Sequence, residues 1–81
     1  MLNSGDLQIV QIFKKRLRSI TQIKKMIVFG SRARGDSTNE SDLDVFIEIQ
    51  KISPELRQRI SETAWEVGFD NNLVISFFLV S

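Results

Sequence analysis

The run from residue 42 to residue 49, DLDVFIEI, constrains the fold more than any other part of the sequence. Every second position in it is apolar: Leu43, Val45, Ile47 and Ile49. A period of two is typical of a β-strand whose two faces differ. One face is therefore expected to join a core. Asp42 and Asp44 share the other face, with side chains at most about 7 Å apart along the strand.

The segments before this strand predict one helix and one further strand. Apolar residues recur at steps of three and four from Leu7 to Ile20, with Lys and Arg opposite, which indicates an amphipathic helix. The short apolar run from Met26 to Phe29 is typical of a buried strand. Residues 31–35 are expected to form a tight turn leading into a short helix, and the polar residues 35–41 a loop.

The segments after it predict a second helix and a last strand. Ser53, Pro54 and Glu55 form a typical helix start, and an apolar stripe follows at helical spacing, at Leu56, Ile60, Ala64 and Val67. Gly68 is expected to end this helix. Trp65 lies beside the stripe and is interpreted as a core or interface anchor rather than a base-stacking platform. Residues 73–80 then form an apolar run of strand length.

The predicted fold class is α/β, with a small mixed sheet of about three strands flanked by helices. The 81 residues suffice for a single domain, 1–81, whose small core favours a partner or a homo-oligomer. Cysteine and histidine are both absent, which excludes disulfides, thiolate zinc sites and imidazole chemistry. The sequence shows neither a signal-peptide pattern nor an apolar run of about 20 residues, so a cytoplasmic protein without membrane contact is expected.

Charge is distributed unevenly along the chain. Residues 1–35 hold eight basic side chains and one acidic, whereas residues 36–81 hold three basic and nine acidic. The basic half could attract phosphate, and the acidic half a metal ion or a basic partner. The alternative is that many of these charges, such as Lys14, Lys15, Glu62 and Glu66, only solvate helix faces. A nucleic-acid binder is disfavoured because the net charge is +1 and basic and aromatic residues are not interleaved.

The stretch FGSRARGDSTNESDLDV, residues 29–45, has the parts of a site for a metal-bound polyphosphate. Gly30 would let backbone amides approach a phosphate, and Ser31 adds a hydroxyl donor. Two carboxylates on one strand face supply the hard oxygen ligands that Mg²⁺ prefers. Each of these features is common by itself, so their order and spacing carry the prediction.

The two arginines of this stretch leave two interpretations open. Arg32 and Arg34 offer guanidinium forks suited to phosphate oxygens. Arg34 could instead pair with Asp36 or Glu40.

The spacing Gly30-Ser31, ten residues, Asp42-Leu43-Asp44 resembles the signature of the DNA polymerase β-like nucleotidyltransferase superfamily. The segments GSRARG (residues 30–35) and SDLD (residues 41–44) are also similar to the usual motifs of this superfamily's minimal nucleotidyltransferase branch. This resemblance implies that Asp42 and Asp44 are catalytic ligands of Mg²⁺, while Gly30 and Ser31 hold the phosphates of a nucleoside triphosphate, ATP first among them. It also implies transfer of a nucleoside monophosphate to a hydroxyl, with loss of pyrophosphate.

The sequence departs from this family's pattern in one respect. Active members carry a third carboxylate on the strand after the helix, where this chain has no acid and the equivalent position is Ile75 or Ser76. Asp70 is the nearest acid, several residues earlier. That carboxylate normally completes the metal site and can act as a base, so triphosphate binding could survive while transfer is slow or lost.

Two functions therefore stay open. One is an enzyme that modifies a hydroxyl, by resemblance on a helical partner protein of the HEPN type found in toxin-antitoxin pairs. The other is a catalytically degenerate module of the same fold that binds a nucleotide or a partner. The chain stops directly after the last predicted strand, where members of this family often continue into another helix or work beside a separate helical protein. Either the chain is cut short there or the acceptor site is supplied in trans, and the exposed apolar edge that such a cut leaves would favour self-association.

Overall fold

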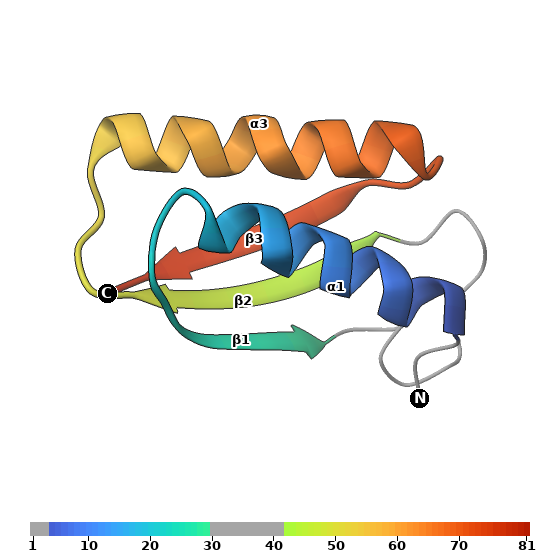
Figure 1. Ribbon diagram of the computed structural model, residues 1–81, viewed down its shortest axis with the longest axis horizontal. Helices are drawn as coiled ribbons and strands as arrows, with labels where there is room; N and C mark the ends of the chain where they lie inside the picture. The colour runs from blue at the N-terminus through green and yellow to red at the C-terminus, as the bar shows by residue number, and fades with distance from the viewer. Residues whose placement is uncertain (1–3, 30–41) are drawn as a thin grey trace.

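The computed structural model describes residues 4–29 and 42–81, which form two helices and three strands. In chain order these are α1 (Ser4–Arg18), β1 (Ile23–Phe29), β2 (Leu43–Ile49), α3 (Pro54–Asp70) and β3 (Ile75–Val80). The strand order in the sheet is β1-β2-β3, with β1 antiparallel and β3 parallel to β2 (Figure 1). The predicted α/β fold with a three-stranded mixed sheet is confirmed. The turn, short helix and loop expected at 31–41 lie outside the described residues.

The central strand β2 has the two different faces that its alternation predicts. Its four apolar residues, Leu43, Val45, Ile47 and Ile49, are completely buried. They pack in one core cluster with Phe13 and Leu17 of α1 and with Ile60 and Val67 of α3. Asp44, Phe46 and Glu48 point to the other face and are only half-buried. Both helices therefore cover one face of the sheet, and no helix of the described residues covers the other.

Helix α1 follows its predicted stripe except at the first turn. Phe13 and Leu17 are fully buried, but Leu7 is 47% exposed, so its assignment to the buried stripe is wrong. Asp6 is buried instead. It lies seven residues before the buried Phe13 and therefore within about 20° of it around the helix, whereas Leu7 is rotated by about 100° from Asp6, away from the buried stripe.

Helix α3 begins where the sequence predicts. The hydroxyl of Ser53 accepts a 3.1 Å hydrogen bond from the backbone N–H of Leu56, and Pro54 is the first helical residue. Such a cap satisfies one of the backbone donors left free at a helix start.

The prediction that Gly68 ends this helix is wrong, because α3 continues to Asp70. Gly68 is buried, and a Cβ there would lie 2.6 Å from the carbonyl oxygen of Leu73. The backbone N–H of Leu73 also donates a 2.9 Å hydrogen bond to the carbonyl of Gly68. The chain reverses after the helix at Asn72, whose φ is 57°. Gly68 thus serves close packing of the chain that leads into β3.

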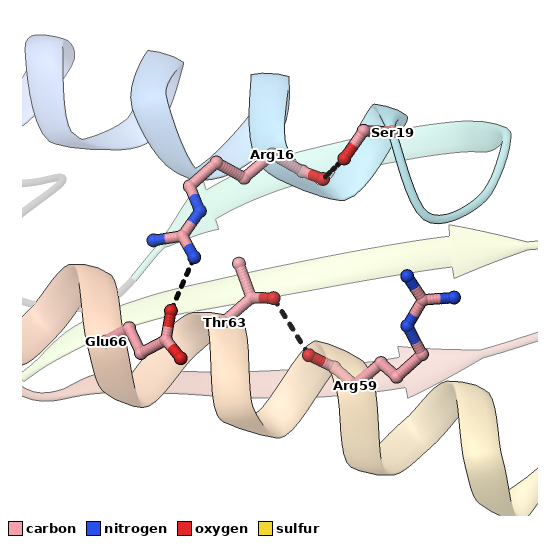
Figure 2. A network of polar contacts seen from close by, with 5 residues as sticks. All are labelled: Arg16, Ser19, Arg59, Thr63 and Glu66. Atoms are coloured by element: carbon pink, nitrogen blue, oxygen red, sulfur yellow. Dashed lines mark hydrogen bonds and ion pairs between the residues drawn. The ribbon is translucent and has the colours of Figure 1, made fainter.

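The two helices are linked by an ion pair on the surface of the helical layer. The guanidinium of Arg16 donates to a carboxylate oxygen of Glu66 (Figure 2). In the same view Thr63 donates to the carbonyl of Arg59, and Ser19 donates to that of Arg16 at the end of α1. Glu66 of α3 is therefore paired with a residue of α1. The alternative that its charge only solvates the surface of its own helix does not hold. Neither α1 nor α3 has the length and apolar character needed to cross a membrane.

Candidate functional site

The two predicted carboxylates lie at the start of the central strand. Asp42 directly precedes β2 and is exposed, and Asp44 is its second residue and is half-buried. Leu43 between them is completely buried in the core. Because side chains alternate along a strand, both carboxylates face the side of the sheet that carries no described helix.

Ser76 of β3 joins the carboxylates on this face. Its Cα pairs with that of Asp44 in the parallel register, and its hydroxyl donates a 3.1 Å hydrogen bond to Oδ2 of Asp42. The neighbouring Ile75 is buried and belongs to the core on the helical side. Of the two positions that the sequence offered for the missing third carboxylate, the structure therefore places Ser76 beside the aspartates and excludes Ile75.

The sheet register arranges the open face in rows. Asp44 lies between Phe29 of β1 and Ser76 of β3, and the next row holds Ile27, Phe46 and Phe78. The ring centroids of Phe29 and Phe78 lie 5.5 Å apart, and the angle between the ring planes is 46°. An exposed apolar and aromatic surface therefore begins directly beside the carboxylates.

The donor set suits a hard divalent cation. Two carboxylates and a hydroxyl offer only oxygen ligands, which Mg²⁺ prefers, and Mg²⁺ usually completes its shell with water and substrate phosphates. Within residues 4–29 and 42–81 no cluster of three or more acidic side chains could hold a metal. Glu48, on the same face, is separated from Asp44 by the row of Phe46, and it pairs in register with Lys25. Asp42 and Asp44 can thus contribute to a metal site that needs further ligands from substrate or solvent.

The predicted phosphate ligands cannot be placed in this site. Gly30, Ser31, Arg32 and Arg34 lie outside the described residues, so their phosphate contacts stay predictions. The strand before them, β1, ends at Phe29, whose Cα pairs with that of Asp44. The described chain therefore leaves the sheet beside the two carboxylates.

Sequence reasoning missed the hydrogen bond of Ser76 and the aromatic pair beside it. One signal was available, because Ser76 is the only polar residue between Leu73 and Val80. A single hydroxyl in an otherwise apolar strand indicates a position that faces something polar. The register between β2 and β3 was still required to identify that neighbour as Asp42.

Comparison with known proteins points to nucleotidyl transfer. A family described as nucleotidyltransferase domain matches residues 9–77. A putative protein adenylyltransferase of Methanocaldococcus jannaschii is 36% identical over 74 residues, which are 86% of this chain and 74% of that protein. Two others with that name from the same organism are 50% identical over 40 residues and 39% identical over 44. Those two matches cover 38% and 44% of the relatives' lengths. No solved structure shows significant similarity to the chain.

Proposed function

Because the chain belongs to the nucleotidyltransferase domain family, we propose that it transfers a nucleoside monophosphate from a magnesium-bound nucleoside triphosphate to a hydroxyl on a protein. The observation that carries this proposal is that Asp42 and Asp44 lie together at one end of the sheet face that no described helix covers. ATP is the proposed donor and a protein the proposed acceptor, because the curated relatives are named as protein adenylyltransferases.

In this proposal each residue has a separate task. Asp42 and Asp44 would hold Mg²⁺, which supplies positive charge to the triphosphate when it is bound. Ser76 would keep the carboxylate of Asp42 oriented through its hydrogen bond. Gly30 and Ser31 would contact the terminal phosphates, since backbone amides and a hydroxyl are suitable donors.

Arg32 would contribute a guanidinium fork to the phosphates. For Arg34 the same role stands beside pairing with Asp36 or Glu40 within its own segment. An Arg34→Ala change separates these roles, because only the first predicts weaker triphosphate binding.

The proposed reaction is an in-line substitution at the α-phosphorus. The acceptor oxygen forms a new bond to this phosphorus while the bond to pyrophosphate breaks. The hydroxyl proton passes to solvent or to the nearer aspartate carboxylate. Positioning and charge neutralisation are the protein's main contributions to such a step.

A second candidate is a module of the same fold that binds nucleotide or partner without transfer. The observation that favours it is the hydroxyl of Ser76 at the position where the family's resemblance implies a third carboxylate. A metal held by two carboxylates can still bind a triphosphate, whereas activation of the acceptor then lacks a ligand and a base.

The acceptor or partner is proposed to be a helical protein of the HEPN type, as in toxin-antitoxin pairs. This proposal rests on the family resemblance of the 81-residue chain and on the protein acceptors in the relatives' names. It predicts labelling of a tyrosine, serine or threonine on such a protein, and not of a small alcohol.

A labelling experiment separates the enzyme from the binding module. The chain is incubated with Mg²⁺, ATP labelled at the α-phosphate and purified HEPN-type proteins, and label on protein is followed. The enzyme predicts label that Asp42→Asn abolishes. Binding of ATP with no label on any partner would reject transfer by this chain and favour the module.

A further inference from the structure

The sheet face that no described helix covers carries a small apolar patch with polar side chains at both ends. Asp44 and Ser76, whose Cα atoms pair in the parallel register, lie at one end. Lys25 and Glu48, which pair across β1 and β2, lie at the other. The patch itself consists of Ile27, Phe29, Phe46 and Phe78.

Two aromatic rings of this patch meet across the central strand. Phe29 belongs to β1 and Phe78 to β3, and β2 runs between these strands. Two strands that flank a third lie about 10 Å apart. The ring centroids are nevertheless only 5.5 Å apart, so the two side chains lean toward each other over β2. We call this pair of rings the aromatic platform.

The aromatic platform offers ring surface to a ligand beside the carboxylates. Phe29 is 39% exposed and Phe78 is 52% exposed, although their rings are in contact. The Cα of Phe29 pairs with that of Asp44, so the platform begins in the same row as this carboxylate. A ligand held at the carboxylates can therefore lie on the rings without leaving the sheet face.

The size of the patch favours a small planar ligand over a protein. The three strands span about 10 Å across the sheet, and the four residue steps from Asp44 to Glu48 span about 13 Å along it. A standard protein interface buries about 800 Å² on each partner, which is several times the area of such a patch. The polar side chains at both ends limit it further. Its dimensions suit one flat ring system.

The distance from the carboxylates fits the base of a nucleotide. Successive rows of side chains on one face of a sheet are about 7 Å apart. A ribose places the base at a comparable distance from the α-phosphate. Aromatic side chains stack on nucleobases through the π-face that every base has. The base of a triphosphate bound at Asp42 and Asp44 can thus reach the platform.

We propose that Phe29 and Phe78 form the binding site for the purine base of the donor nucleotide. This proposal rests on the proposed function, because it places the base of the triphosphate whose phosphates Asp42 and Asp44 would hold through Mg²⁺. The four side chains of the patch carry no hydrogen-bonding group, so they recognise the base by stacking and apolar contact. A purine has the larger ring surface and is therefore bound more tightly than a pyrimidine.

Calorimetric titration of Mg-ATP, Mg-UTP and Mg-tripolyphosphate into the chain tests this site. Mg-ATP should bind about tenfold more tightly than Mg-tripolyphosphate, which has no base, and more tightly than Mg-UTP. Phe78→Leu keeps an apolar side chain and removes the ring. It should weaken Mg-ATP binding about tenfold and leave Mg-tripolyphosphate binding unchanged. A merely structural role of Phe78 would instead weaken both ligands alike.

Phe69→Leu is the matched control. Phe69 is also an exposed aromatic residue, at 67%, but it stacks on Trp65 of α3 and lies away from the open sheet face. This variant should bind both ligands as the wild-type chain does, and circular dichroism verifies that both variants are folded. Unchanged Mg-ATP binding in Phe78→Leu would overturn the proposal, as would an equal loss in Phe69→Leu. A Phe78→Leu chain that lost only a protein partner would assign the platform to that partner.

The failure of this proposal can be distinguished from failure of the proposed function. Equal affinity for Mg-ATP and Mg-tripolyphosphate would reject the base site and keep the phosphate site. Mg-ATP binding that depends on Phe78 but survives the Asp42→Asn, Asp44→Asn double variant would keep the base site and reject the carboxylates as metal ligands. A wild-type chain that binds neither ligand would reject both proposals.

Discussion

The hydroxyl of Ser76 donates a 3.1 Å hydrogen bond to Oδ2 of Asp42. This contact joins residues 34 positions apart and sets a neutral side chain where the family resemblance implies a third acid. The site therefore has two carboxylates at the start of β2 and a hydroxyl on β3. Its chemistry depends on how well this set holds a metal and activates a hydroxyl.

Ser76→Asp should create the missing ligand. Without metal, a third carboxylate beside Asp42 repels it, so the free energy of unfolding should fall by about 1 kcal/mol. Mg²⁺ should restore this loss, because the new carboxylate adds a ligand. Thermal unfolding with and without Mg²⁺ measures both effects.

Ser76→Asn is the control for this change, because it has nearly the same shape as aspartate and no charge. The aspartate variant should also raise pyrophosphate release from Mg-ATP. If both variants responded to Mg²⁺ alike, Ser76 would not lie at a metal site.

Gly68→Ala should destabilise the protein although alanine favours helix. A Cβ at this position would lie 2.6 Å from the carbonyl oxygen of Leu73, so the backbone before β3 must move. Overpacking of this kind costs about 1–3 kcal/mol. Urea unfolding measures the cost, with Ser61→Ala on an exposed position of α3 as control. An increase in stability in Gly68→Ala would show that the close approach is absent.

Ser53→Ala should lower the free energy of unfolding by about 1 kcal/mol, because the N–H of Leu56 loses its cap. The same Ser61→Ala variant controls for loss of a hydroxyl from α3. Equal unfolding midpoints for the two variants would contradict the capping role.

The Arg16–Glu66 pair should contribute little to stability despite its short contact. The two side chains are 42% and 53% exposed, and exposed pairs typically contribute about 0.2–1 kcal/mol. A double-mutant cycle with Arg16→Ala and Glu66→Ala should give a coupling energy in this range that shrinks at high salt. A coupling above about 2 kcal/mol would mean that the pair is far better shielded from water than these exposures indicate.

Local sequence patterns predicted most of the fold. The alternation in β2 gave the correct buried face, because a strand with one covered face must place its apolar residues on that face. The predicted start of α3 was correct because the hydroxyl cap of Ser53 and the proline at position 54 involve only residues within one helical turn. Gly68 was misread because a glycine needed for close packing looks the same in sequence as a helix stop. What it packs against, Leu73, is known only from the fold.

The candidate site was only partly predictable. Asp42 and Asp44 were placed correctly on one face because two residues of one strand keep a fixed relation. The role of Ser76 depends on the register between β2 and β3, which the crossover through α3 sets and no local pattern encodes. Burial of Trp65 could not be predicted from local pattern either. Its position beside the apolar stripe was compatible with a core residue, but its side chain is 67% exposed.

The most direct test of the central claim is calorimetric titration of Mg-ATP into the chain and into its Asp42→Asn, Asp44→Asn double variant. Asparagine keeps the shape and removes the charge, so the comparison isolates the two carboxylates, and ATP without Mg²⁺ is the second control. We predict magnesium-dependent binding by the wild-type chain and its loss in a double variant that remains folded. Binding of equal strength by the double variant, or no binding by the wild-type chain, would contradict a nucleotide site at Asp42 and Asp44.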